Sequence, residues 1–504
     1  MKRKSGILMP VSSLPSPYGI GAFSKEAYEF VDFLAEAGQT YWQLLPLGQT
    51  GYGDSPYQSF STFAGNPYFI DLDRLVEAGY LEAGELAAAD FGTDPEHVAY
   101  DKIYSERFRI LRNAYHNSPY ALQVAERWAG QQEETAAFEA FIEKHAAWLP
   151  DYALYSAIKN ASGGRSLSDW DDAIRLRRPE AMETYKKELA DEIRFYEFQQ
   201  YLFRKQWSAL KQYANEKGIQ MIGDIPIYVA SDSADAWANP ELFQLDEHGR
   251  PSAVAGCPPD SFSATGQLWG NPLYRWDYHK ETGYKWWLER LSACFELYDV
   301  VRIDHFRGFD EYFAIPYGDT TAENGKWMPG PGMDIMNAIK AKFGDRPIIA
   351  EDLGFLTPTV LKLVKDTGYP GMKLLQFAFD SREPGDYLPH NYPHNCVLYT
   401  GTHDNDTVMG WKNHVSPEDL DFAYRYLNMH PEDALNWVMI RAAFASVADT
   451  VIIPMQDYLG LGSEARINTP STLGNNWQWR MQSDAIEPEL AGQIRELTEL
   501  YGRA

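Results

Sequence analysis

The sequence is poor in cysteine and in basic residues. Its three cysteines, Cys257, Cys294 and Cys396, are widely spaced and form no CxxC pair. This argues against a zinc knuckle or a disulfide framework and fits a reducing compartment. Only 45 Lys and Arg stand against 71 Asp and Glu, so the formal net charge is −26. Proteins that bind nucleic acid or an anionic membrane surface need a basic surface, so we expect neither partner.

Long apolar stretches are also missing. The run at 6–10 follows basic residues near the N-terminus but is too short for the core of a signal peptide. A membrane-spanning helix needs roughly 18 or more consecutive apolar residues, which no segment approaches. We therefore expect a cytoplasmic protein without a membrane partner.

What is present fits a large globular chain. Hydrophobic residues make up 45% of the 504 residues and charged residues 23%, which excludes a disordered or fibrous protein. The length allows either about three domains or one large α/β barrel with insertions. Aromatic residues reach 14%. Most of them must fill the core, and the remainder could offer flat apolar faces to sugar rings.

Short apolar runs recur along the chain, and each resembles a strand buried on both faces. The eight runs are 6–10, 41–47, 220–229, 300–306, 347–353, 372–379, 396–402 and 450–455. Helical patterns follow several of them, as at 27–35 before Gly38, at 335–343 before Gly344, and from the capping residue Thr357 to Gly368. This alternation predicts an α/β fold, a (β/α)8 TIM barrel, and disfavours an open doubly wound sheet.

Two connections are too long for simple loops between a strand and a helix. We expect one catalytic barrel over 1–504 with two large insertions. Residues 50–215 are predicted to form a largely helical inserted subdomain, with helices over 136–148 and 188–214. Residues 230–299, rich in Trp, Pro and Gly, are predicted to form an active-site or lid region. Insertions at the C-terminal face of a barrel usually build the active site.

Carboxylates stand near the ends of four predicted strands: Asp224, Asp304, Glu351 and Asp404. Buried charges are costly unless they are paired or functional. Retaining glycoside chemistry needs a nucleophile and an acid/base about 5–5.5 Å apart. Arg302 lies two residues before Asp304, so strand alternation puts both on one face, where the guanidinium would keep Asp304 ionised. Glu351 would need a raised pKa to donate a proton at neutral pH.

Each of these residues also has a plainer interpretation. The alternatives are a structural ion pair for Arg302 and Asp304, a metal site at Glu351-Asp352, a metal site or helix cap at 403–406, and a buried hydrogen-bonding role for Asp224. Taken together, the four carboxylates favour a carbohydrate-active barrel.

Longer motifs carry a family resemblance. They are the segments 8–15, 51–59, 256–260 and 266–272, together with the strand ends. With these, the chain resembles the 4-α-glucanotransferases, also called amylomaltases or disproportionating enzymes, a branch of the α-amylase superfamily. The matches span nearly the whole chain and are weakest over about 80–195.

The resemblance implies a role for each matching position. Asp304 would be the nucleophile, Glu351 the acid/base, and Asp404 the third carboxylate, which stabilises the transition state. The implied substrate-binding residues are Tyr57, Asp224, Asp260, Trp269, Arg302, His305, His403 and Asn468. Among them, Tyr57 would stack on a glucose ring at the bond being cut, and Asp260 and Trp269 would belong to a flexible loop over the site.

The resemblance also implies the reaction. A segment of an α-1,4-glucan would pass to the 4-hydroxyl of glucose or another α-1,4-glucan through a covalent glycosyl-aspartate, with retention of configuration and with no metal or cofactor. The expected partners are maltooligosaccharides, amylose and glucose. Three alternatives stay open: an α-glucan hydrolase with the same carboxylates, a non-catalytic glucan-binding barrel, and a metal-dependent barrel enzyme.

Overall fold

The computed structural model describes residues 3–51, 53–123, 128, 132–259, 263–354, 356–382 and 385–504. Eight strands form one parallel sheet in the order β10-β11-β12-β1-β2-β3-β6-β9. Their bounds are β1 Lys4–Leu8, β2 Tyr41–Gln43, β3 Gln220–Pro226, β6 Val300–Asp304, β9 Ile348–Ala350, β10 Gly371–Leu374, β11 Cys396–Tyr399 and β12 Thr450–Pro454. Every predicted apolar run overlaps one of these strands.

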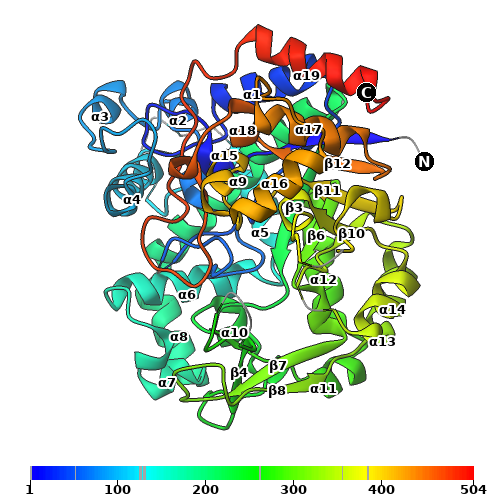
Figure 1. Ribbon diagram of the computed structural model, residues 1–504. Helices are drawn as coiled ribbons and strands as arrows, with labels where there is room; N and C mark the ends of the chain where they lie inside the picture. The colour runs from blue at the N-terminus through cyan, green and yellow to red at the C-terminus, as the bar shows by residue number, and fades with distance from the viewer. Residues whose placement is uncertain are drawn as a thin grey trace.

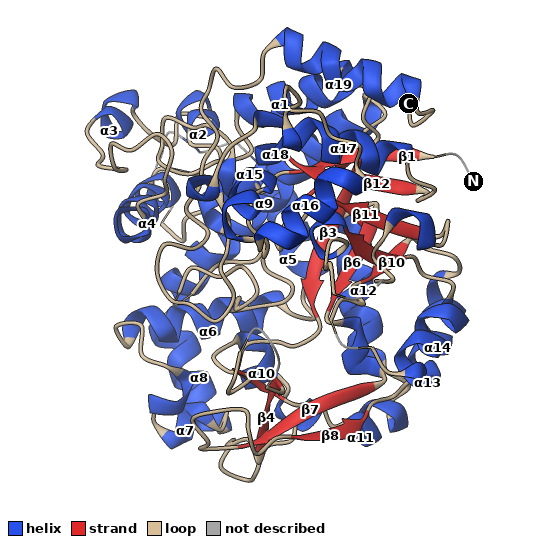
Figure 2. Ribbon diagram, in the orientation of Figure 1, coloured by secondary structure: helices blue, strands red, loops and turns tan. Residues whose placement is uncertain are grey.

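The two ends of this sheet approach each other and nearly close it into a barrel (Figure 2). The amide of Ala350, at the end of β9, donates to the carbonyl of Pro370 just before β10, at 3.0 Å. The amide of Met372 on β10 donates to a carboxylate oxygen of Asp352 at 2.7 Å. The predicted (β/α)8 barrel is therefore confirmed, and the open sheet is excluded.

Helices on the outside of the barrel contain the helical patterns that the sequence predicts. They include α1 (Lys25–Glu36), α13 (Met333–Phe343) and α14 (Pro358–Thr367). The Thr357 hydroxyl accepts a hydrogen bond from the amide of Val360, and Gly368 ends α14 in the left-handed region at φ 72°. In the described part of 375–395, which joins β10 to β11, the helical elements are the 3-10 turns Leu375–Phe377 and Pro389–Asn391. This connection is interrupted by Pro and Gly, which disfavour a helix.

The long connection from β2 to β3 is helical, as predicted, and extends along one side of the barrel (Figure 1). Its helices are α2 Asp73–Glu77, α3 Ala83–Ala87, α4 Tyr100–His116, α5 Gln132–Lys144, α6 Leu149–Ala161, α7 Asp172–Arg175, α8 Pro179–Glu188 and α9 Ala190–Glu216. The long helix α9 packs against α4, α5, α6 and α8 and also against α1 and β3. It thus joins the inserted helices to the barrel.

A second, antiparallel sheet lies away from the barrel, at the bottom of Figure 2. Its order is β5-β4-β7-β8, with β4 at Ala253–Cys257, β5 at Gln267–Pro272, β7 at Glu311–Pro316 and β8 at Lys326–Pro329. The sequence analysis did not predict this sheet. Strands from the 230–299 region thus pair with strands that follow β6.

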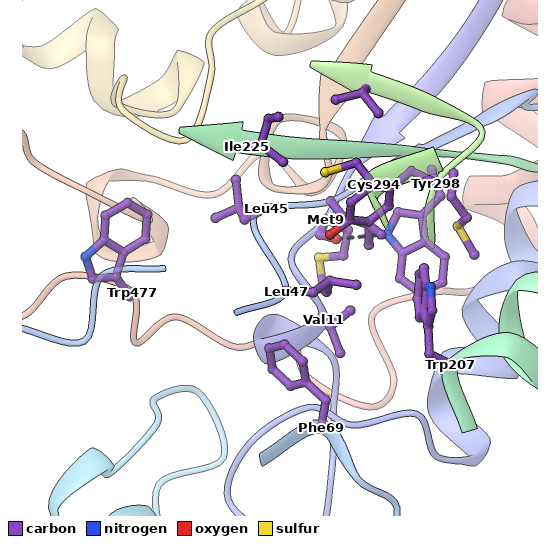
Figure 3. Packing of buried hydrophobic residues seen from close by; sticks show 14 of the residues in the cluster. Met9, Val11, Leu45, Leu47, Phe69, Trp207, Ile225, Cys294, Tyr298 and Trp477 are labelled. Carbon is purple, nitrogen blue, oxygen red and sulfur yellow. Dashed lines mark hydrogen bonds between the residues drawn. The ribbon is translucent and has the colours of Figure 1, made fainter. Parts of the chain in front are cut away.

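The remaining helices are divided between the barrel and the inserted region, where α10 packs against α6. They are α10 Ala234–Ala238, α11 Trp276–Glu281, α12 Lys285–Leu297, α15 Val408–His414, α16 Pro417–Tyr426, α17 Leu435–Ala445, α18 Met455–Leu459 and α19 Pro488–Leu500. The main apolar core runs through barrel and insertion alike, and Figure 3 shows part of it, from Trp207 to Trp477. The subdomain boundaries 50–215 and 230–299 stay a prediction.

Within the residues that the structure describes, no helix combines the length and the apolar character that crossing a membrane requires.

Candidate active site

A buried arginine holds two carboxylates at the mouth of the barrel. Arg302 donates from Nη1 to both oxygens of Asp224, at 2.7 and 2.6 Å, and from Nη2 to Oδ1 of Asp304, at 3.0 Å. Its Nε contacts the Met372 sulfur at 3.3 Å. The Arg302 side chain is only 3% exposed. Burial lowers its pKa, but the charges of Asp224 and Asp304 outweigh this effect and raise the pKa above its usual value, so Arg302 stays charged. Because Arg302 is itself held by Asp224, its hydrogen bond to Asp304 fixes the position of the Asp304 carboxylate.

Glu351 follows β9, the strand next to β6. Its Oε2 accepts the amide of His305 and its Oε1 accepts the amide of Leu353, both at 2.7 Å. Burial and the nearby charge of Asp304 raise the pKa of Glu351, against the opposing effects of Arg302 and the two amides. Glu351 therefore holds its proton to a higher pH than an ordinary glutamate, as a general acid requires.

Asp304 differs from Glu351 in its surroundings. Burial raises the pKa of Asp304, and the charges of Asp224 and Asp404 raise it further, while Arg302 opposes the shift. The side chain keeps 28% of its surface exposed and faces the cleft. The pKa of Asp304 stays below that of Glu351. The two environments thus favour an ionised aspartate beside a protonated glutamate.

Asp404 follows β11 and is held by a loop from after β12. The Asn468 side-chain amide donates to Oδ1 of Asp404 at 2.6 Å, and the Asn468 backbone amide donates to the His403 carbonyl at 3.1 Å. Arg466 donates to the carbonyl oxygens of both Asp404 and Asn468, each at 2.7 Å. The loop therefore fixes both the main chain and the carboxylate of Asp404.

Flat rings surround these carboxylates. Tyr57 stacks on His403 with centroids 5.2 Å apart and an interplanar angle of 15°, and its hydroxyl donates to Asp224 at 2.9 Å. Trp477 lies 5.9 Å from both rings. Trp269, on β5, meets His305 edge-on at 4.9 Å. Aromatic faces of this kind suit the apolar faces of sugar rings.

His305 has an unusual backbone conformation and an unusually low pKa. It lies in the left-handed region at φ 52°, which is uncommon outside glycine and is often found at functional sites. Burial, helped by the charge of Arg307, lowers the pKa of His305 to about 3, so the ring is neutral. Among the described residues, its buried Nε2 finds no hydrogen-bond partner.

Most of the predicted site residues line one cleft of about 330 Å³. From the prediction, the cleft contains Tyr57, Trp269, Asp304, His305, His403, Asp404 and Asn468. Glu351 touches His305 from beside this cleft. Asp224 is fully buried and holds Arg302 and Tyr57, so its predicted contact with sugar stays a prediction. Asp260 lies outside the described residues.

Two residues of this site were missed by the sequence analysis. Trp477 packs on Tyr57 and His403, and Arg466 braces Asp404. Both lie in a loop without regular periodicity. The one signal was the nearness of Arg466 to Asn468 in the chain.

No group of three or more His, Cys, Asp or Glu side chains in the described ranges is arranged to hold a metal ion. The independence from metal remains a prediction, and the experiment below tests it.

Comparison with known proteins decides the family. A family model described as 4-alpha-glucanotransferase matches residues 9–486. The chain belongs to the 4-α-glucanotransferase family. The 4-alpha-glucanotransferase of Clostridium butyricum is 51% identical over 98% of this chain and 100% of its own length. That of Streptococcus pneumoniae is 49% identical over 100% of this chain and 98% of its own length.

Solved structures agree with this assignment to the 4-α-glucanotransferases. An amylomaltase from Streptococcus agalactiae in complex with acarbose superimposes with a TM-score of 0.96 at 42% identity, covering all of both chains. An amylomaltase from Corynebacterium glutamicum gives a TM-score of 0.77 over 99% of this chain and 74% of its own, at 19% identity, and supports the fold alone.

Proposed function

We propose that this enzyme transfers a segment of an α-1,4-glucan to the 4-hydroxyl of glucose or of another α-1,4-glucan. The observation that carries this proposal is that Asp304, which is bound by Arg302, and Glu351 stand at the ends of two neighbouring strands, β6 and β9. Their pKa order suits a nucleophile and a general acid. Membership of the 4-α-glucanotransferase family supports transfer as the outcome.

In the first step, Asp304 attacks the anomeric carbon while Glu351 gives its proton to the leaving glycosidic oxygen. The electron pair of the broken bond stays on that oxygen, and the donor segment becomes an ester of Asp304. Arg302 binds Oδ1 of Asp304, which leaves the other oxygen to react.

In the second step, the ionised Glu351 takes the proton of an acceptor 4-hydroxyl, whose oxygen displaces Asp304 from the anomeric carbon. Two inversions retain the α configuration. A carboxyl oxygen that carries a proton can still accept a hydrogen bond, so the amides of His305 and Leu353 can remain bonded to Glu351 in both of its protonation states.

The remaining cleft residues would bind and orient sugar. Asp404, fixed by Asn468, would hold hydroxyl groups and stabilise positive charge at the reacting carbon. Neutral His305 and the stacked His403 would also bind hydroxyls, while Tyr57 and Trp269 would cover ring faces. The relative solved with acarbose supports a glucan-like ligand in this cleft. Asp260 keeps its proposed glucan contact on the strength of the sequence motif.

The partners proposed are maltooligosaccharides, amylose and glucose. These substrates are neutral, which accommodates a net charge of −26. We propose a cytoplasmic location from the reducing environment that three scattered cysteines indicate. The structure leaves Cys294 and Cys396 as buried free thiols.

Incubation with pure maltotriose tests the reaction. We expect glucose and longer maltooligosaccharides, with almost no rise in reducing ends, because each bond cut is replaced by one formed. A steady rise in reducing ends with only shorter products would support the hydrolase. No change would support a glucan-binding protein. A parallel reaction with EDTA should proceed equally fast, and loss of activity there would support the metal-dependent alternative.

A further inference from the structure

The loop that fixes Asp404 continues into a segment, residues 470–477, that the mechanism does not use. At its tip lies Leu473, whose side chain is 74% exposed. This is the largest exposed fraction among the exposed large hydrophobic residues of the described part of the chain. Single exposed apolar side chains are common on protein surfaces, so the exposure of Leu473 becomes informative only through its position in the fold.

Leu473 lies on the wall of the catalytic cleft. It lines the same cavity as Asp304 and Asp404. Across the cleft it approaches Gly53, where a Cβ atom would lie 3.5 Å from the Leu473 Cδ2. The cleft thus holds carboxylates at its reacting centre and a bare isobutyl group at its rim.

The segment holds Leu473 in a fixed place. Ser471, Asn475 and Trp477 all have left-handed backbones, with φ of 63°, 58° and 64°. Such backbones cost free energy and persist where their surroundings impose them, often at ligand-binding sites. The buried Asn476 side chain supplies that support by accepting the amide of Thr469 at 3.0 Å.

The same Asn476 side chain also closes the segment from the other side. It donates to the carbonyl and the hydroxyl oxygen of Thr472, at 3.2 and 3.1 Å. The tip is therefore preorganised, and a ligand that covers Leu473 need not first order the loop.

We propose that Leu473 is a specificity-determining residue that contacts a glucosyl unit away from the bond being cut and favours longer glucans. Sugar rings carry apolar C–H faces, and covering the isobutyl group with such a face removes apolar surface from water. Asn476 is the positioning residue for this contact. The inference rests on the proposed function, since it assumes an α-glucan in the cleft.

The contact acts at a distance from the reacting carbon. It should therefore strengthen ground state and transition state alike, which changes KM and leaves kcat unchanged. A glucan too short to reach the rim gains nothing from it. The effect should hence grow with donor length.

The test compares Leu473→Ala with the wild type on maltotriose and maltoheptaose, with kcat and KM measured for each. We expect the KM for maltoheptaose to rise about three- to tenfold, the size that loss of most of a leucine side chain allows. The KM for maltotriose should change less, and kcat should stay within about twofold for both. Leu473→Met, which keeps the apolar surface, should restore the KM.

Two further variants keep the proposal falsifiable. Asn476→Ala should raise the KM for maltoheptaose in the same direction, because it frees the tip. Leu500→Ala removes another highly exposed leucine, on α19 and 64% exposed, and should change neither kcat nor KM. An unchanged KM in Leu473→Ala at both lengths, or a fall in kcat alone, would overturn the proposal. Disproportionation of maltotriose by the wild type tests the proposed function separately.

Discussion

Arg302 and Asp304, two residues apart on β6, are joined by a 3.0 Å hydrogen bond between Nη2 and Oδ1. Strand alternation puts both side chains on the barrel interior, and the same guanidinium reaches Asp224 on the next strand. A buried cation here offsets the cost of burying two carboxylates. It also turns one oxygen of Asp304 away from reaction and leaves the other for the cleft.

The pH profile of transfer should be bell-shaped. Asp304 must be ionised, so activity falls as the pH drops through its pKa, which is raised above the ordinary value. Glu351 must be protonated, so activity falls as the pH rises through its pKa, which is raised further. Transfer rates measured from about pH 4 to about pH 10 test whether the profile has these two limbs.

Glu351→Gln separates the two limbs. An α-glucosyl fluoride donor needs no acid to expel its leaving group, so the variant should still release fluoride. Its fluoride release should keep the acidic limb and lose the alkaline one. An alkaline limb that persists in this variant would show that another group controls it.

Replacing Arg302 should change both stability and the acidic limb. In Arg302→Met the pKa of Asp304 rises further, because the opposing charge is gone, so the acidic limb moves to higher pH. The fully buried Asp224 and the partly exposed Asp304 also lose their partner, at a cost of about 3–5 kcal/mol in the free energy of unfolding. Arg302→Lys keeps the charge and should shift the limb less. pH profiles and urea unfolding measure the two effects, and an unmoved limb in Arg302→Met would contradict the account.

Tyr57 acts through both its hydroxyl and its ring. Tyr57→Phe loses the hydrogen bond to Asp224 but keeps the stack on His403, and we expect kcat/KM to fall about tenfold, which is the size of one charge-assisted hydrogen bond. Tyr57→Ala loses both and should fall much further. The control is Tyr213→Phe, which also removes a tyrosine–aspartate hydrogen bond, to Asp32, but at an exposed position. Its kcat/KM should stay unchanged. Equal losses in Tyr57→Phe and Tyr57→Ala would rule out a role for the ring.

Arg503 links segments at the amino-terminal ends of strands β1 and β12. Its fully buried guanidinium donates to the carbonyls of Phe444 and Ala448, both at 2.9 Å, and to that of Lys4 at 3.3 Å. Arg503→Ala removes these hydrogen bonds, although Arg3 still donates to the Phe444 carbonyl at 2.7 Å. Because buried hydrogen bonds are lost, we expect a decrease of about 3 kcal/mol in the free energy of unfolding.

The control for Arg503 is Arg425→Ala. Its pairing with Asp421 is exposed on both sides, and exposed pairs contribute little. The midpoint of thermal unfolding should be distinctly lower for Arg503→Ala than for Arg425→Ala. A similar midpoint for both would mean that the buried hydrogen bonds do not stabilise the barrel.

The barrel was predictable because its strands are buried on both faces and therefore appear as continuous apolar runs. The cap at Thr357 and the stop at Gly368 were equally local. The antiparallel sheet was not predictable in this way. Ala253–Cys257 pairs with Glu311–Pro316, far along the chain, and includes a glycine and an irregular register beside β5. Pairing of that kind depends on tertiary contacts that no local pattern records.

The site residues also differ in how far the sequence could predict them. Asp304 ends a barrel strand, and Glu351 and Asp404 follow two others, so topology alone brings them to one end of the barrel. Asn468 was assigned from family resemblance, and Trp477 was missed, because both lie in an irregular loop held by hydrogen bonds to Asp404 and His403 rather than by periodicity.

The most direct test of the account is capture of the covalent intermediate. Glu351→Gln is incubated with α-maltosyl fluoride and without an acceptor, then digested and analysed by mass spectrometry. Without the base that activates an acceptor, the intermediate should accumulate, and the peptide that contains Asp304 should carry one maltosyl unit. Fluoride release without any adduct, or an adduct on Asp404 instead, would contradict the assignment of Asp304 as the nucleophile.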